Sequence, residues 1–134
     1  MRAVSSEQTW IHIFEEEEKL PEHEQTKFHL KVLDIEEEGF LDDNLGTMTD
    51  DGYSLKLGKQ EILALDIGLA NVENLMGDDG QPVMFERDVK LKQIRPKLHP
   101  WRRDHLSKIP KAKRRALARL IVDGPKLKEA ERKN

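Results

Sequence analysis

Residues 68–85 have the sequence GLANVENLMGDDGQPVMF, and this stretch contains the strongest turn signal in the chain. Two short runs rich in apolar residues, Val72–Leu75 and Val83–Phe85, flank the segment Gly77–Gly80. The two glycines of this segment tolerate positive φ, and its two aspartates can accept hydrogen bonds from their own backbone. An Asp-Gly pair between two such runs predicts a β-hairpin or a tight loop at the centre of the chain.

The net charge changes sign at the same stretch. Residues 1–85 contain 6 Lys and Arg against 20 Asp and Glu, a net charge of −14, whereas residues 86–134 contain 17 against 6, a net charge of +11. Two interpretations of this asymmetry are open. Either the two halves attract each other, within the fold or between copies, or the basic half forms a surface for an acidic partner or a nucleic acid.

The composition limits the size of the core. The 134-residue chain is 37% hydrophobic and 37% charged, which is poor in apolar residues for a globular protein. We expect a single domain over residues 8–124, with a flexible N-terminus at 1–7 and a disordered basic tail at 125–134. The absence of cysteine excludes disulfides, zinc–thiolate sites and a cysteine nucleophile.

The sequence predicts a soluble cytoplasmic protein that does not enter a membrane. No apolar run approaches the roughly 20 residues that a transmembrane helix needs. The first residues, Met1–Ser6, lack the apolar core of a signal peptide.

Three segments in the N-terminal half have the composition of strands. Thr9–Phe14 is β-branched and aromatic, which predicts a strand buried on both faces. Apolar and polar side chains alternate in residues 26–34, which predicts a half-buried strand that pairs with the first one. Residues 36–58 are rich in turn formers, and within them Tyr53–Leu57 indicates a short third strand.

Several short helices are also expected. Apolar residues at helical spacing around Leu65 predict a helix over residues 59–69. Asp88 is expected to cap a helical turn over residues 89–94, and another short helix is expected over residues 100–106.

The last predicted helix is basic. It covers Lys111–Val122, begins after Pro110 and ends at Gly124. With the preceding elements it predicts an α+β fold, in which a short antiparallel sheet is formed by the N-terminal strands and the central hairpin. Three to four short helices are expected to pack on this sheet.

Residue patterns typical of catalysis or metal binding are not found in the sequence. Its five histidines are His12, His23, His29, His99 and His105. They lack the i, i+3 or i, i+4 spacing of a metal site, and the acidic clusters at 42–44 and 78–79 lack the ligand pattern of a calcium loop. No serine stands in a nucleophile elbow, and no Gly-rich phosphate loop is present. We therefore expect a protein that is not an enzyme and binds no metal or cofactor.

The basic helix and the segment before it provide the candidate binding surface. Clustered Lys and Arg side chains neutralise anionic groups, and an exposed tryptophan can stack on a base. The candidate partner-binding residues are Trp101, Arg102, Arg103, Arg114, Arg115 and Arg119. Two questions stay open: whether Trp101 fills the core instead, and whether the basic side chains bind protein, bind nucleic acid or only solvate the outer face of an amphipathic helix.

Several motifs between residues 26 and 124 belong together. They are Phe28–Leu33, Gly68–Leu75, Asp79–Phe85, and Ile109-Pro110 followed by Arg115–Ile121. This set resembles small bacteriophage and prophage proteins, namely the tail assembly chaperones of long-tailed phages and related minor tail-region proteins. Two departures are that Val72 stands where an aromatic residue is common in that group, and that the C-terminal helix is more basic than usual.

The resemblance implies a non-catalytic protein of the host bacterial cytoplasm that acts through protein–protein contacts during tail assembly. Proteins of that group hold an aggregation-prone partner, typically the tape-measure protein, while the tail is built. The implied partners are therefore tail proteins, either the tape-measure protein or a tube subunit. The alternative hypothesis is a nucleic-acid-binding accessory protein that uses the basic C-terminal helix.

Overall fold

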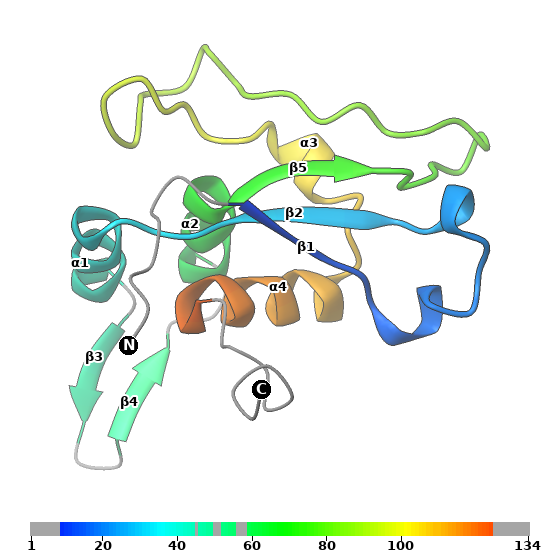
Figure 1. The fold of residues 1–134 in the computed structure, drawn as a ribbon. Coiled ribbons are helices and arrows are strands. Elements are labelled where there is room, and N and C mark those ends of the chain that lie inside the picture. The colour runs from blue at the N-terminus through cyan, green and yellow to red at the C-terminus, as the bar shows by residue number, and fades with distance from the viewer. Residues whose placement is uncertain (1–8, 45, 50–51, 56–58, 125–134) are drawn as a thin grey trace.

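The computed structural model describes residues 9–44, 46–49, 52–55 and 59–124. The predicted flexible N-terminus at 1–7 and the predicted basic tail at 125–134 lie outside these residues. The described residues form an α+β fold, in which a three-stranded antiparallel sheet packs against short helices (Figure 1). The predicted fold class is confirmed.

The strands of this sheet are β1 (Thr9–His12), β2 (Lys27–Lys31) and β5 (Leu69–Glu73), in the order β1-β2-β5. Both pairings are antiparallel, so the predicted pairing of the two N-terminal strands is confirmed. Two short 3-10 helices, η1 (Glu15–Glu17) and η2 (Glu22–Glu24), form part of the connector between β1 and β2.

The central strand, β2, has the predicted alternation. Phe28 and Leu30 are buried, whereas Lys27, His29 and Lys31 are half-buried. Because successive side chains of a strand point to opposite faces, one face of β2 enters the core and the other carries polar side chains.

β1 differs from the predicted strand that is buried on both faces. It pairs only with β2 and is an edge strand, and its residues alternate between exposed and half-buried. Trp10 packs against the core, while Ile11 is exposed. The β-branched and aromatic composition identifies the strand, but it does not reveal whether a second layer covers the outer face.

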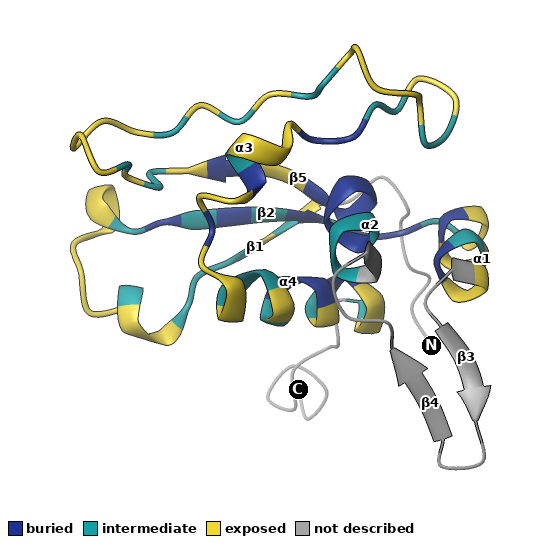
Figure 2. Ribbon diagram, turned by 180° about the vertical axis from the view of Figure 1, so that it is seen from behind, coloured by how far each residue is buried: buried dark blue, intermediate teal, exposed yellow. Residues whose placement is uncertain are grey.

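The α-helices are α1 (Ile35–Asn44), α2 (Lys59–Gly68), α3 (Arg103–Leu106) and α4 (Lys111–Asp123). α2 and α4 pack against each other, and Leu65, Leu117 and Ile121 join them to the core beneath the sheet. Figure 2 shows that the buried residues gather where these helices meet β2 and β5. The helices predicted over residues 59–69 and 111–122 are confirmed.

α1 lies in the region that the sequence predicts to be rich in turns. Its first turn is closed reciprocally, because the Glu37 backbone N–H donates to Asp34 Oδ1 (2.7 Å) and the Asp34 N–H donates to Glu37 Oε1 (3.0 Å). This is a capping-box arrangement with aspartate in the cap position. Residues 42–44, interpreted as a turn, form the last turn of this helix instead, since the cap and the buried Leu41 hold the helix together.

The prediction of a helix over residues 89–94 is wrong. Asp88 caps only a single turn, in which its Oδ1 accepts from the Lys90 N–H (3.1 Å) and its carbonyl accepts from the Leu91 N–H (3.2 Å). The segment has no continuous apolar face to bury, so the core does not stabilise a longer helix.

The helix predicted over residues 100–106 is shorter than expected, because α3 begins only at Arg103. Trp101 forms an isolated antiparallel bridge with Arg87. This pairing keeps the backbone before α3 extended. The sequence around Pro100 favours a helix locally and does not reveal the pairing.

β3 (Gly46–Thr49) and β4 (Gly52–Leu55) form a separate antiparallel two-stranded sheet. The strand predicted over residues 53–57 is confirmed for residues 53–55, and residues 56 and 57 lie outside the described part of the chain. β4 pairs with β3 and not with the N-terminal strands.

The tight loop predicted at the central Asp-Gly pair is confirmed. The Gly77 N–H donates to the Gln81 carbonyl (2.8 Å), and Gly80 has a φ of 76°, a region that glycine favours. β5 is the first arm of the hairpin. The second arm pairs briefly, through a hydrogen bond from the Val83 N–H to the Leu75 carbonyl (2.7 Å), and then runs along the sheet edge beyond β5 (Figure 1).

Candidate functional site

Trp101, the predicted aromatic contact, lies in the core and is only 4% exposed. Its indole Nε1–H donates to the Leu69 carbonyl at 3.0 Å, and its ring meets Phe85 edge-on at a centroid distance of 6.2 Å. Of the two alternatives for this residue, the core assignment therefore holds. The ring is not presented to a base or to a partner surface.

Trp101 belongs to a polar cluster around a buried carboxylate, which also contains Asp66, Arg87 and Arg103 and is here called the Asp66 cluster. Asp66 is 1% exposed. Its Oδ1 accepts from Arg103 (2.7 Å) and from the Trp101 backbone N–H (2.9 Å), and its Oδ2 accepts from the second terminal nitrogen of Arg103 (2.9 Å). A buried carboxylate is costly unless it is paired and hydrogen-bonded, and here three donors satisfy it.

Arg87 completes the Asp66 cluster from the other side. Its guanidinium carbon lies 3.8 Å from the centroid of the Trp101 ring, a cation–π contact. It donates to three backbone carbonyls, those of Asp66 (2.6 Å), Leu69 (3.2 Å) and His99 (3.2 Å). Burial lowers the pKa of Arg87 to about 10, against a smaller opposing effect of the Asp66 charge, so Arg87 stays positively charged at neutral pH.

Sequence patterns do not predict this cluster, although one signal for it is present. Asp66 lies four residues after Ile62 and one after Leu65, on the side of α2 that carries the apolar residues. A charged residue at such a position needs a buried partner. The partners, Arg87 and Arg103, lie 21 and 37 residues further along the chain, and local sequence does not indicate them.

The predicted partner-binding arginines have different environments. Arg103 is held by Asp66, as described above. Arg102 is exposed and forms a bidentate pair with Asp104, at 3.1 and 2.9 Å. The hydrogen bond of this pair raises the pKa of Arg102 and lowers the pKa of Asp104.

The remaining three arginines lie on α4. A terminal nitrogen of Arg114 donates to the Ile109 carbonyl (2.5 Å), and Arg115 Nε donates to Glu61 Oε1 (2.9 Å). Arg119 is exposed, and no ion pair to it is found within the described ranges.

An exposed basic stripe runs along α4 through Lys111, Arg115 and Arg119. These residues are spaced four apart, so they lie on one side of the helix. The stripe is the part of the predicted basic surface that the structure leaves facing solvent.

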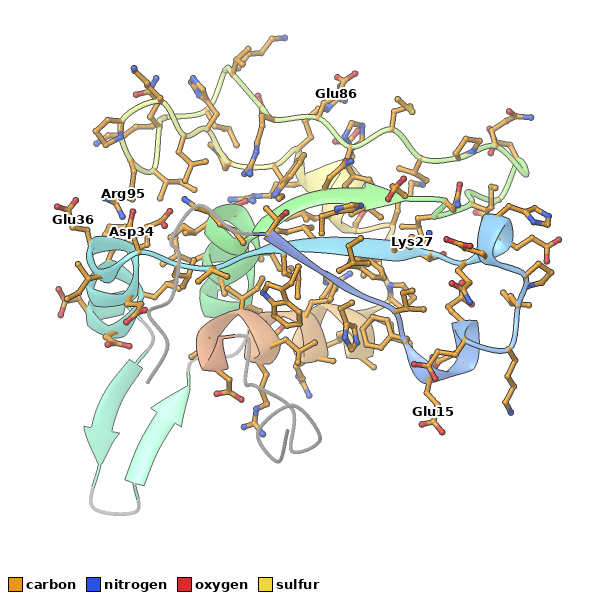
Figure 3. The ribbon with its side chains drawn as sticks, in the orientation of Figure 1. Glu15, Lys27, Asp34, Glu36, Glu86 and Arg95 are labelled. Carbon is orange, nitrogen blue, oxygen red and sulfur yellow. The ribbon has the colours of Figure 1, made fainter. Side chains whose placement is uncertain are left out.

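The two oppositely charged halves of the chain attract each other within the fold. The side chain of Lys113 contacts Glu16, in addition to the pairs of Arg115 with Glu61 and of Arg103 with Asp66. Arg95 reaches toward the start of α1 (Figure 3), and its guanidinium lies 3.1 Å from the Glu36 carboxylate and 3.9 Å from that of Asp34. The first interpretation of the charge asymmetry therefore accounts for these residues.

A second surface lies at the opposite end of the molecule from α4. The outer segment, residues 83–91, runs beyond β5 (Figure 1). It is fastened to the chain before α3, because the Asp88 N–H donates to the Pro100 carbonyl (2.7 Å) and the Arg102 N–H donates to the Glu86 carbonyl (3.0 Å). The half-buried Arg87, whose guanidinium donates to three backbone carbonyls, holds the middle of this segment.

The outer segment carries large apolar side chains in solvent. Met84 is 73% exposed and Val89 is 72% exposed, and Leu91 is also exposed. Lys90 lies between the last two and is exposed as well. This segment combines a fixed backbone with exposed apolar side chains and with exposed charges of both signs, at Glu86 and Lys90.

A pocket of about 340 Å³ lies between α1 and the C-terminal end of α4. Four buried apolar residues line it, Val32, Leu33, Leu41 and Ile121, together with the carboxylates of Glu38, Asp42 and Asp123. Sequence patterns do not predict this pocket, because its residues come from three separate segments.

Metal clusters and membrane spans are not found in the described part of the chain. Across these residues, no three His, Asp or Glu side chains lie close enough together to hold a metal ion. None of the helices in the same ranges is long and apolar enough to cross a membrane. No protein-family model, curated protein or solved structure matches the chain.

Proposed function

We propose that this chain is a non-catalytic binding protein that acts through protein–protein contacts, as a tail-assembly or structural accessory protein of a bacteriophage or prophage. The observation that carries the proposal is the outer segment. Its exposed Met84 and Val89 stand on a backbone fixed by hydrogen bonds and by the half-buried Arg87.

A fixed apolar segment is well suited to binding another protein. Because its backbone is already ordered, binding does not have to pay for ordering it, and more of the contact energy appears as affinity. Methionine is flexible and polarizable, which lets Met84 adapt to an irregular partner surface. Charged neighbours such as Lys90 would speed the encounter with an acidic partner.

The motif resemblance provides the class of partner. A tape-measure protein or a tube subunit exposes apolar surface before it is assembled, and the outer segment would cover part of it. The exposed Arg102 lies beside this segment, since its backbone pairs with Glu86. The proposal therefore keeps Arg102 as a partner contact and adds Met84 and Val89.

Co-expression with a tape-measure protein tests the proposal. We expect the parent chain to keep the tape-measure protein in the soluble fraction and to co-purify with it. The double variant Met84→Asp/Val89→Asp should lose both effects. The matched control is Ile35→Asp, since Ile35 is 83% exposed but lies at the start of α1. Equal behaviour of the two variants, or no co-purification with the parent, would refute the proposal.

A nucleic-acid-binding role is the second candidate, and the basic stripe on α4 favours it. Lys111 and Arg119 present positive charge on one side of the helix, and between them lies Arg115, which pairs with Glu61. Such binding should weaken steeply between about 50 and 200 mM salt, and Lys111→Glu/Arg119→Glu should abolish it, whereas the outer-segment variant should not. Absence of DNA or RNA binding at the lower salt concentration would dismiss this role.

A further inference from the structure

The pocket between α1 and α4 has an acidic rim and lies at the ends of two helices. Its rim holds the carboxylates of Glu38, Asp42 and Asp123. It also lies where α1 and α4 both end, and neither helix has a basic residue in its last turn. A helix C-terminus carries partial negative charge, so positive charge is favoured at this end of the pocket.

The floor of the same pocket is apolar. Leu33 comes from the chain after β2, Leu41 from α1 and Ile121 from α4, and all three are buried. The volume of about 340 Å³ lies at the lower end of ligand pockets, which span roughly 300–1,000 Å³. The site therefore fits one medium-sized apolar group flanked by positive charge.

The chain leaves α4 at the edge of this pocket. Gly124 lines it and has a φ of 76°, and its N–H closes the helix on the carbonyls of Leu120 (3.0 Å) and Ile121 (3.3 Å). Ten residues follow Gly124 in the sequence, PKLKEAERKN. At about 3.3–3.6 Å per residue, the third of them, Leu127, can reach about 10 Å from Gly124.

We propose that the pocket is the docking site of the chain's own C-terminal segment, residues 125–134. Leu127 is the one large apolar side chain of this segment, and Lys126 and Lys128 flank it. Leu127 enters the apolar floor, while the two lysines face the carboxylate rim and the two helix ends. This pairing places positive charge at the helix C-termini, where it is stabilising.

The lack of cysteine in the chain provides a sharp test. Ala130→Cys introduces a single thiol that carries a nitroxide spin label, and NMR relaxation then reports which amides lie near it. We expect the label to broaden the amides of residues 38–42 in α1. The effect should persist in Ala130→Cys/Leu127→Met, which keeps an apolar side chain, and should be lost in Ala130→Cys/Leu127→Asp.

A charge exchange tests the rim separately. In the Ala130→Cys chain, Glu38→Lys should weaken the broadening in α1, and adding Lys128→Glu should restore it. If the Leu127 and Glu38 variants leave the broadening unchanged, or if α1 is not broadened at all, the proposal is overturned.

Two other occupants give distinct results. In the first experiment, spin-labelled protein is mixed with isotope-labelled protein that carries no spin label. The α1 amides of the isotope-labelled protein broaden only if the segment docks on a second copy, and this result would overturn docking within one chain.

A titration with cadaverine, a simple diamine, tests the pocket as a site for a free cation. Shifts of the α1 amides that are equal in the parent and in Leu127→Asp would show that the segment does not occupy the pocket.

Discussion

Gly68, the last residue of α2, lies directly against the side chain of Ile121 in α4. A Cβ atom placed on Gly68 would overlap the branched carbons of Ile121, which is itself buried. The absence of a side chain at position 68 therefore lets the two helices approach closely, at the point where α2 turns into β5.

Gly68→Ala should destabilise the fold by about 1–3 kcal/mol, the usual cost of overpacking a core. Urea unfolding followed by circular dichroism gives the free energy of unfolding. Gly39→Ala is the matched control, because Gly39 lies inside α1 and a methyl group there would have no neighbouring atom within 4 Å. That change should be neutral or stabilising by up to about 1 kcal/mol through helix propensity.

The overlap can also be relieved from the other side. Ile121→Ala alone should cost about 2–5 kcal/mol by leaving a cavity. Combined with Gly68→Ala, it should cost less than the sum of the two single changes, because the new methyl group enters the space that Ile121 leaves. Strict additivity would show that the two residues do not contact each other as described.

Replacing Arg103 and replacing Asp66, the two members of the ion pair, should destabilise the fold by different amounts. The Asp66 side chain is 2% exposed, whereas that of Arg103 is 46% exposed. Arg103→Ala leaves a buried carboxylate without its main counter-charge and should cost about 3–5 kcal/mol. Asp66→Asn should cost less, because Arg103 can turn toward water and the amide oxygen can still accept from the Trp101 N–H.

Arg102→Ala is the control for this pair of variants, since Arg102 and Asp104 form their ion pair on the surface. Its unfolding midpoint in urea should stay close to that of the parent. An equal loss for Arg102→Ala and Arg103→Ala would contradict a buried role for Asp66.

The cap of α1 should make stability depend on pH. The backbone hydrogen bond from Glu37, aided by the charges of Arg95 and Lys31, holds the pKa of Asp34 below its usual value of 3.8. A lowered pKa in the folded state stabilises the fold above the unfolded-state pKa, and this contribution is lost as the pH falls through the folded-state pKa. Asp34→Asn should therefore be less stable than the parent at pH 7, and the difference should shrink below about pH 4.

Asp43→Asn, an exposed change in the last turn of the same helix, is the control for the cap. Urea unfolding at several pH values from about 7 to about 2.5 measures both variants. A gap between the parent and Asp34→Asn that stays constant over this whole range would mean that ionised Asp34 does not act as the cap.

Arg87→Lys should loosen the outer segment without unfolding the domain. Lysine keeps the charge but cannot reach the three carbonyls of Asp66, Leu69 and His99 at once. Hydrogen exchange of the Asp88 and Arg102 amides should accelerate, while exchange in β2 should stay unchanged. Arg114→Lys, which changes the contact with the Ile109 carbonyl at the start of α4, should affect neither amide.

The parts of the fold that the sequence predicts correctly are determined by neighbouring residues. The Asp-Gly turn, the alternation in β2 and the helix between Pro110 and Gly124 depend on local backbone preferences and on the spacing of apolar residues. α1 is a missed local signal, because the Asp34–Glu37 cap is visible in the sequence but the acidic run around it is typical of turns.

The candidate sites depend on contacts between distant residues, and for this reason the sequence predicts them poorly. The neighbours of Trp101 and Arg103 make both residues candidates for a basic surface. Asp66, which lies 35 and 37 residues earlier, instead binds the Trp101 backbone N–H and the Arg103 guanidinium. Local sequence predicts a helix over residues 89–94, which include the end of the outer segment. It does not reveal that residues 86–88 of this segment pair with residues 100–102.

The attraction between the two halves also determines when the chain can fold during its synthesis. Residues 1–85, with their excess of 14 negative charges, emerge from the ribosome before residues 86–134, which hold most of their counter-charges. α4 supplies Leu117 and Ile121 to the core and Arg115 to Glu61, and it is made last among the described elements. The nascent chain therefore stays without a complete core until translation has passed residue 123, and in that interval it depends on its own charge repulsion to remain unaggregated.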